Sequence, residues 1–349
     1  MMQTVERVGP EKVAGDAVPV LFLAHNERRL LPDFLRHYRS FGNVTFLAID
    51  DGSDDGTREY LLEQPDVTVF APAQGTAYAT HKVDWRREVL DAYGTGKWCL
   101  VPDVDEHFIH VETSFDAMLD KLDGEGAEVL LTVMVDMYAD RPLRDQPMPE
   151  EGQRLTDLFP YFDGPRAMPG YVLRPAGKKK LQQHPTPTVK IFGGMRERVF
   201  NIAQKELGWL DRFAMQYFAI DKDPSWSGPM RIVSKALSKR INGVVADAQK
   251  MNKVGLLKWR RGGQFSGGPH AIDQKLAESS GRAAFLHFTF AGGEQALRYT
   301  AERGSHYEGG RYYKRMLDAE DTMSRSPVIA ESVRYDGPSA LTGIIKQIT

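Results

Sequence analysis

The sequence of 349 residues predicts an α/β fold, in which a mostly parallel sheet is flanked by helices. Several short, continuous apolar runs have the length of strands that are buried on both faces, and residues 18–24 are the first of them. Segments with apolar residues at helical spacing lie between these runs, and the links are short. Alternation of this kind is typical of parallel strands joined by right-handed crossovers.

The predicted elements follow one another in a regular order. Strands are expected at 18–24, 44–49, 67–70, 98–101 and 129–137, and helices at 28–41, 58–63, 83–93 and 114–122. Residues 139–188 are rich in Pro, Gly, Asp and Arg, so they are expected to form long functional loops. Short strands at 188–192, 228–234, 254–259 and 283–290 predict an antiparallel extension, and 294–303 and 309–320 predict C-terminal helices.

Both ends of the chain differ from this pattern. Residues 1–17 are expected to be a flexible lead-in, because they mix charges and have no long apolar run. They also lack the apolar region of a signal peptide, and no apolar run approaches the roughly 20 residues of a membrane span, so a cytoplasmic protein is expected. Residues 321–349 are expected to form a tail that packs on the body, and Pro327 and Gly337-Pro338 disfavour regular structure there.

Charge and cysteine content exclude some classes of function. The net charge of −2 gives no electrostatic reason to expect a nucleic-acid partner. Cys99 is the only cysteine, which excludes an internal disulfide and a thiolate zinc cluster.

Two carboxylates one residue apart, Asp103 and Asp105, follow the strand at 98–101, and Glu106 and His107 come directly after them. Carboxylates crowded this closely repel one another unless a cation neutralises them. Oxygen ligands suit Mg²⁺ or Mn²⁺, which protein sites usually hold with one or two carboxylates and substrate phosphates. We therefore expect a metal–diphosphate site, and the alternative is a solvated acidic turn.

Two more polar clusters lie directly after the first two predicted strands. His25, Asn26 and Glu27 follow the first strand, and Asp50 and Asp51 follow the second. Ligands of parallel sheets bind beyond the carboxyl ends of the strands, so all three clusters are expected to meet at one edge. As an alternative, Asn26 and Glu27 only cap the following helix.

The segment from Asp50 to Thr57 has other interpretations, which the spacing tests. An EF-hand loop that starts at Asp51 would need a bidentate Glu at its twelfth position, where Leu62 stands. A phosphatase nucleophile motif fails because Ser53 occupies the place of its first Asp. Turn and capping chemistry alone stays open as an explanation for this segment.

In combination, residues 20–27, 49–57 and the Asp103–Asp105 motif resemble the family 2 glycosyltransferases, which have the Rossmann-type GT-A fold. More narrowly, they look like a bacterial branch whose metal motif reads Asp-x-Asp-Glu-Phe. Here Glu106 is kept, but His107 stands where Phe is common. The resemblance covers residues 18–320, and further similar segments are 135–138, 193–196, 258–259, 268–270 and 286–288.

The resemblance implies a single domain over residues 18–320, with a nucleotide-sugar-binding half at 18–137 and an acceptor half at 138–320. It implies that a sugar passes with inversion from a nucleotide-sugar donor to a hydroxyl of a glycan or lipid-linked glycan acceptor. The product would belong to a bacterial surface polysaccharide or lipopolysaccharide. Such an enzyme would be cytoplasmic and could contact the inner face of the membrane peripherally.

The resemblance also assigns roles to single residues. Asp50 or Asp51 would contact the nucleotide base, Asp103 would face the ribose or the metal shell, and Asp105 would bind Mn²⁺ or Mg²⁺. His287 is a further candidate metal ligand, although a lone histidine in an apolar strand is commonly a hydrogen-bonded core residue. The expected donor pocket also includes His25, Asn26, Glu27, Lys82 and Arg86, and the last two are otherwise part of a solvated helix face.

The general base is the least determined part of the site. Inversion needs a carboxylate or a histidine within hydrogen-bond reach of the acceptor hydroxyl. Glu197, Asp211 and His270 are the candidates. Two other functions stay open, a sugar-phosphate nucleotidyltransferase and a non-catalytic sugar- or nucleotide-binding protein on the same fold.

Overall fold

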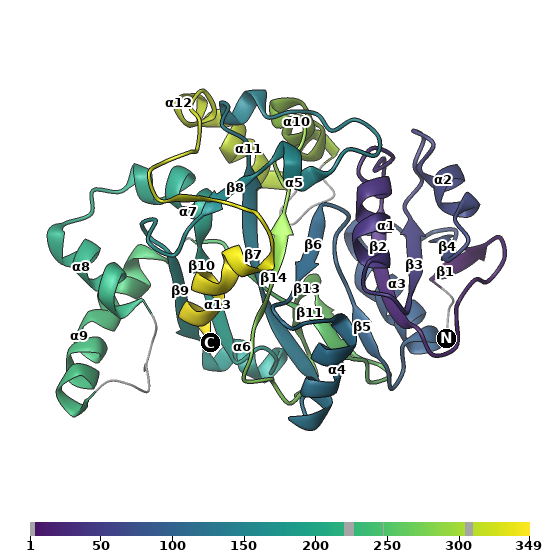
Figure 1. Cartoon of the computed structure of the whole chain (residues 1–349), viewed down its shortest axis with the longest axis horizontal. Coiled ribbons are helices and arrows are strands. Elements are labelled where there is room, and N and C mark those ends of the chain that lie inside the picture. The colour runs from purple at the N-terminus through teal and green to yellow at the C-terminus, as the bar shows by residue number, and fades with distance from the viewer. Residues whose placement is uncertain (1–3, 220–226, 247, 304–309) are drawn as a thin grey trace.

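The computed structural model describes residues 4–219, 227–246, 248–303 and 310–349. At its centre lies a sheet with the strand order β1-β4-β3-β2-β5-β11-β7-β14-β6 (Figure 1). Strands β4, β3, β2 and β5 are parallel neighbours, and β14 is parallel to β7. Strand β11 lies antiparallel between β5 and β7. The predicted α/β fold, with a mostly parallel sheet and an antiparallel extension, is confirmed.

The sheet and its extensions have the following strands: β1 Val5–Val8, β2 Val18–Ala24, β3 Val44–Asp50, β4 Val67–Pro72, β5 Trp98–Leu100, β6 Glu106–Ile109, β7 Val129–Tyr138, β8 Tyr161–Asp163, β9 Tyr171–Pro175, β10 Val189–Gly193, β11 Asn252–Lys258, β12 Phe265–Ser266, β13 Gly268–Ile272, β14 Ala283–His287 and β15 Ser332–Arg334. The helices are α1 Leu31–Arg39, α2 Thr57–Glu63, α3 Tyr78–Tyr93, α4 Phe115–Gly124, α5 Leu155–Leu158, α6 Lys178–Gln183, α7 Gly194–Phe200, α8 Trp209–Phe218, α9 Gly228–Val244, α10 Gly293–Arg303, α11 Arg311–Asp318, α12 Glu320–Met323 and α13 Thr342–Ile348.

Helices cover both faces of the sheet at β2, which explains why this strand is apolar throughout. In β2, Val20 and Phe22 pack in one core cluster with residues of α1, α2 and α4. The intervening Leu21 packs in a second cluster with residues of α3. Successive side chains of a strand point to opposite faces, so a strand buried on both sides needs apolar residues at every position.

Two predictions about irregular segments are wrong, and a third is confirmed only in part. Residues 5–8 of the expected lead-in form β1, which pairs antiparallel with β4. Residues 139–188 hold β8, β9, α5 and α6 among their loops. The expected tail packs on the body as predicted, but it also forms β15 and α13, and α13 buries Ile344, Ile345 and Ile348. Pro327 and Gly337-Pro338 lie before α13 begins, so they do not prevent this helix.

The predicted strand at 228–234 is wrong as well, because these residues begin α9. Pro229 lies in the first turn of the helix, where its missing N–H costs nothing. The apolar run was too short to distinguish a strand from a helix. The expected helix at 309–320 is present as α11 from Arg311, and residue 309 lies outside the described residues.

The edge strand β6 depends on a side chain from α1. The Tyr38 hydroxyl is buried, donates to the Glu106 carbonyl at 2.9 Å, and accepts from the Phe108 N–H at 3.1 Å. It thus satisfies two backbone groups that a neighbouring strand would otherwise satisfy.

We expect Tyr38→Phe to destabilise the protein by about 2–4 kcal/mol, because it leaves two buried backbone groups without a partner. Urea unfolding measures this loss. The same change at the exposed Tyr217 is the control and should be nearly neutral. Equal stability of the two variants would contradict the role of Tyr38.

Cys99 lies fully buried in β5. Burial raises the pKa of its thiol to about 12, so the reactive thiolate is suppressed. We expect no alkylation of the native protein at mildly alkaline pH and one equivalent after unfolding, as measured by mass spectrometry. Rapid labelling of the native chain would show that β5 is accessible.

In the part of the chain that the structure describes, none of the helices has both the length and the apolar character to span a membrane.

Candidate functional site

The ends of β2 and β3 lie side by side, as the sequence predicts. Ala24 pairs with Asp50 in the parallel register, and the Asp51 N–H donates to the Ala24 carbonyl at 2.9 Å. The His25 ring adds a contact, because its Nδ1 lies 2.7 Å from the Asp51 carbonyl oxygen and donates to it. Val20 pairs with Leu100, so β5 brings the Asp103 segment to the same edge.

Asn26 joins the first two clusters instead of capping a helix. Its φ of +60° lies in the left-handed region, which asparagine tolerates better than most residues. Its side chain donates to Asp54 at 2.8 Å and to the Tyr299 hydroxyl at 3.0 Å, and accepts from the Asp54 N–H at 2.9 Å. Helix α1 begins only at Leu31. Asn26 therefore fixes the loop after β3 and links it to α10.

The two aspartates at the end of β3 have different surroundings. Asp50 is fully buried, and its carboxylate accepts from Arg58 at 2.6 Å. Asp51 forms an ion pair with Arg303 of α10. Burial raises the pKa of Asp51 even though the Arg303 guanidinium opposes this effect. Of the two, only Asp51 keeps part of its side chain exposed, and Asp50 holds the loop.

Both Lys82 and Arg86 lie on α3 near the acidic cluster, and Lys82 is only half-buried. Arg86 is buried, and its Nη2 lies 3.7 Å from Asp103 Oδ1. Burial lowers the pKa of Lys82, and the nearby Arg86 lowers it further. The ammonium of Lys82 lies 4.7 Å from the centre of the Tyr78 ring. Helix α3 thus supplies positive charge beside Asp103.

A buried lysine, Lys253 of β11, occupies the centre of the acidic cluster. Its Nζ lies 2.5 Å from Asp103 Oδ2 and 2.6 Å from Glu106 Oε2, and its side chain is only 1% exposed. Glu106 Oε2 also accepts from the Asp103 N–H at 2.9 Å. Burial would raise the pKa of Asp103, but Lys253 and Arg86 lower it overall. Burial raises the pKa of Glu106 to about 7 despite the neighbouring ammonium.

A local irregularity in β11 places this lysine. The pairing of β11 with β7 changes register between Lys253 and Leu256. Gly255 lies within the irregular stretch, and a Cβ there would come within 2.2 Å of the Phe285 ring. Only glycine allows this close approach. The sequence signal for the site was a charged residue at the head of an apolar strand, and it was missed.

Asp105 and His287 form the second part of the cluster. His287 Nε2 lies 3.4 Å from Asp105 Oδ2, and His287 Nδ1 lies 3.0 Å from the buried Asp136. Asp136 also accepts from Arg196 Nε at 2.9 Å. Burial opposes the charged imidazole, but Asp105 and Asp136 outweigh it and raise the pKa of His287 to about 9. The Asp105 carboxylate raises the pKa of the neighbouring Glu27 further, beyond the effect of burial.

The predicted metal ligands come together only in part. In residues 4–219, 227–246, 248–303 and 310–349, no three His, Cys, Asp or Glu side chains gather as a metal-binding group. Asp103 faces Lys253, so its charge is already compensated. Asp105 and His287 remain, and Asp136 fixes the other nitrogen of the ring as carboxylates do behind metal-bound histidines. A divalent cation that displaces the proton from His287 Nε2 would fit this pair. Such a pair would need substrate phosphates to complete the coordination.

The three base candidates are scattered. Asp211 caps α8 through the Gly208 N–H and pairs with Arg240 of α9, outside the cluster. Glu197 is buried in α7 and accepts from Asn201 at 2.6 Å. His270 alone lies beside the cluster. Its Nδ1 donates to a backbone carbonyl at 3.0 Å, and burial and Lys253 lower its pKa to about 4.

The backbone of Gly193 packs directly against the backbone of Gly170. The φ of Gly193 is +124°, and a Cβ would lie 1.9 Å from the Gly170 carbonyl oxygen. A tight backbone contact within the fold therefore explains this glycine.

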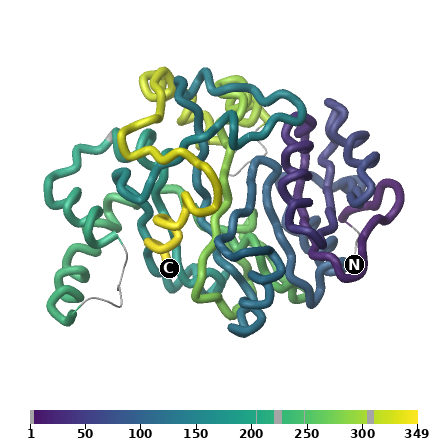
Figure 2. Tube along the Cα trace, viewed as in Figure 1, coloured from purple at the N-terminus to yellow at the C-terminus, as the bar shows by residue number. Residues whose placement is uncertain are grey.

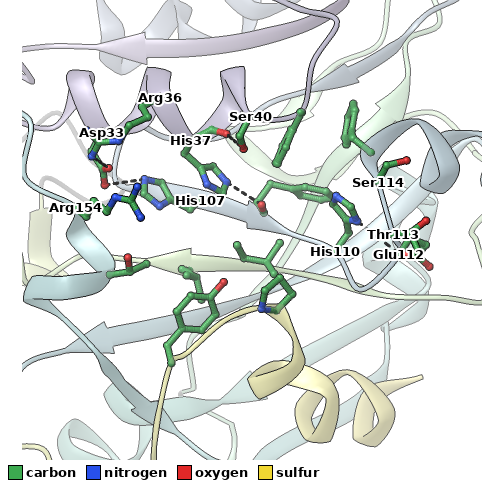
Figure 3. A pocket seen from close by; sticks show the side chains of 18 residues that line it. Asp33, Arg36, His37, Ser40, His107, His110, Glu112, Thr113, Ser114 and Arg154 are labelled. Atoms are coloured by element: carbon green, nitrogen blue, oxygen red, sulfur yellow. Dashed lines mark hydrogen bonds and ion pairs between the residues drawn. The ribbon is translucent and has the colours of Figure 1, made fainter.

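A separate cavity of about 570 Å³ lies between α1, β6, α4 and residues 335–338 (Figure 3). Neighbouring side chains of a strand point to opposite faces, so His107 lines this cavity while Glu106 faces Lys253. The rings of His37 and His107 stack here at 4.3 Å. Burial lowers the pKa of His107 to about 3, which keeps its ring neutral. Strand β6 separates the cavity from the acidic cluster.

No protein-family model matches the sequence, and no curated protein matches it. The fold is similar to a candidate glucose-1-phosphate thymidylyltransferase from Bacillus anthracis, at 10% identity over 39% of this chain and 65% of that one, with a TM-score of 0.26. It is also similar to a 4-diphosphocytidyl-2C-methyl-D-erythritol synthase, at 18% identity over 40% and 66%, with a TM-score of 0.26. A candidate nucleotide-diphospho-sugar transferase from Desulfovibrio desulfuricans G20 gives 11% identity over 34% and 58%, with a TM-score of 0.22. The chain spans less than two thirds of each of these proteins, and similarities this low do not bear on its function.

Proposed function

We propose that the protein is a metal-dependent glycosyltransferase, which moves a sugar from a nucleotide diphosphate to an acceptor hydroxyl with inversion. The observation that supports this most is the arrangement of Asp136, His287 and Asp105. The Asp136 carboxylate fixes the imidazole of His287, whose second nitrogen lies beside Asp105. Mn²⁺ or Mg²⁺ held by Asp105 and His287 would stabilise the charge that develops on the nucleoside diphosphate leaving group.

The surrounding residues are suited to the rest of the donor. Asp51 and His25 lie at the ends of β2 and β3, where the nucleotide would bind. Arg86 and Lys82 add positive charge on the side of α3, where a diphosphate would need it. Asp103, held by Lys253, would face the ribose rather than the metal.

His270 is the base candidate that this arrangement favours. Donation from Nδ1 to a carbonyl leaves Nε2 with its lone pair, next to the cluster. Its low pKa keeps the ring neutral, so Nε2 can accept a hydrogen bond from the acceptor hydroxyl, but it also makes His270 a weak base. The acceptor, a glycan or lipid-linked glycan of a bacterial surface polymer, would approach from this side.

A thermal-shift screen of nucleotide sugars, with and without Mn²⁺, tests the proposal. A ligand that binds only the native state at 100 times its dissociation constant stabilises it by about 2.7 kcal/mol. We expect one nucleotide sugar to raise the melting temperature only when Mn²⁺ is present. No shift with any donor would contradict the proposal.

Two further assays separate the alternatives. A nucleotidyltransferase would release pyrophosphate when it is incubated with a nucleoside triphosphate and a sugar phosphate. A non-catalytic binding protein would bind a nucleotide sugar but neither hydrolyse it nor transfer its sugar to any acceptor. The proposed enzyme releases a nucleoside diphosphate and no pyrophosphate.

A further inference from the structure

Helix α8 exposes three large aromatic side chains, Trp209, Phe213 and Tyr217, which we call the aromatic stripe. Their side chains are 79%, 41% and 59% exposed. The spacing of four residues places all three on one side of the helix. The opposite side is buried through Ala214 and Met215. The buried side of α8 already packs on the rest of the protein, so the aromatic stripe is not needed to hold the helix in place.

The stripe lies on a part of the molecule that projects from the sheet. Helices α8 and α9 pack on each other beside β9 and β10, at the left of Figure 1, away from the body (Figure 2). The rings of Phe213 and Tyr217 are in contact at 5.1 Å. Helix α9 adds Met230 and Ile232, which are 41% and 73% exposed. Apolar surface gathered on one projecting unit usually marks an interaction site.

The charge of the same two helices identifies the kind of partner. They carry one acidic residue, Asp211, which is paired with Arg240 at 2.6 Å. The whole chain has a net charge of −2, so the positive charge here is local. The helices carry five basic residues, namely Arg212, Arg231, Lys235, Lys239 and Arg240.

We propose that this surface docks on an anionic lipid bilayer. Tryptophan and tyrosine favour the boundary between lipid headgroups and acyl chains. Their rings contact the acyl chains there, while the N–H or O–H group contacts water. Lysine and arginine beside them are attracted to anionic headgroups. The stripe would enter the boundary and the basic residues would contact the headgroups. The inference does not depend on the proposed catalytic function.

Vesicle sedimentation tests this directly. The full-length protein is mixed with phosphatidylcholine vesicles, either pure or containing phosphatidylglycerol. We expect binding to the anionic vesicles, little binding to the neutral ones, and release when NaCl is raised, because salt screens the attraction. A wild-type protein that stays in the supernatant with anionic vesicles would overturn the proposal.

Two variants separate the aromatic and the basic contributions. Trp209→Ser combined with Phe213→Ser and Tyr217→Ser should weaken binding at least about tenfold, because it removes the apolar anchor. Lys235→Glu with Lys239→Glu should abolish the preference for anionic vesicles. Lys275→Glu with Lys346→Glu, on other exposed parts of the surface, is the matched control and should bind like the wild type.

The main competing occupant is a second copy of the chain. If sedimentation equilibrium showed a wild-type dimer that the triple serine variant converts to a monomer, and vesicles bound both proteins equally, the surface would be a dimer interface and the proposal would be wrong. Circular dichroism confirms that each variant is folded. All substituted side chains are exposed, so their folds should be unchanged.

Discussion

Replacing Lys253 with methionine should destabilise the folded protein by about 3–5 kcal/mol at neutral pH. The lysine ammonium is 1% exposed and lies within 2.6 Å of carboxylate oxygens of Asp103 and Glu106. Its loss leaves Glu106, which is fully buried, with no compensating charge at hydrogen-bond distance. Removal of one partner of a buried ion pair costs more than the pair itself contributes, because the other charge stays buried. Guanidinium unfolding, followed by circular dichroism, measures the loss.

Strand β11 offers a matched control for this experiment. Lys258 lies on the same strand, is 34% exposed and pairs with the half-exposed Asp123. The same change there, Lys258→Met, should cost less than about 1 kcal/mol. Adding Glu106→Gln to Lys253→Met should restore part of the stability, since it removes the uncompensated charge. A Lys253→Met protein as stable as Lys258→Met would show that the buried cluster contributes nothing.

Asp105→Asn is expected to abolish Mn²⁺-dependent binding of the nucleotide sugar and all sugar transfer. The amide has nearly the same shape as the carboxylate, but it has no charge to offer the cation. Asp136→Asn should have a smaller effect, about 10–100-fold on metal affinity, because Asp136 orients His287 but does not itself hold the cation. Both effects are measured by calorimetry with the nucleotide sugar identified in the thermal-shift screen.

The exposed Asp120 of α4 provides the control for these carboxylates. Asp120→Asn removes the same charge at a distance from the cluster and should leave binding unchanged. Unaltered Mn²⁺-dependent affinity in Asp105→Asn would refute the role of Asp105. A loss of binding in all three variants would point to general electrostatics instead.

The sheet could be predicted because its physical signal is local. Strands β2, β3 and β5 are buried on both faces, so β2 and β5 are continuous apolar runs and β3 is interrupted only by Thr45 before it ends at Asp50. Polar residues directly after such runs must lie at the carboxyl edge of the sheet, which is how His25, Asp51 and Asp103 could be placed together. The aspartate pair between β5 and β6 was visible for the same reason.

The residues that complete the cluster come from distant segments, and no local pattern shows which side chains they will contact. Lys253 reaches Asp103 across 150 positions of sequence, through a register change in β11 that depends on Gly255. Arg303 reaches Asp51 across 252 positions. Single-residue candidates such as Asp211 were indistinguishable from helix caps, and Asp211 is indeed a cap. The start of α9 was misread because its short apolar run suits a strand as well as a helix.

The central claim is that Asp105 and His287 hold a divalent cation together with a nucleotide diphosphate. Electron paramagnetic resonance of Mn²⁺ tests it most directly, because free and bound Mn²⁺ give different signals. We expect one Mn²⁺ to bind per chain when a nucleotide diphosphate is present, and we expect this binding to be lost in Asp105→Asn and in His287→Gln. Bound Mn²⁺ that is unaffected by both substitutions would contradict the claim.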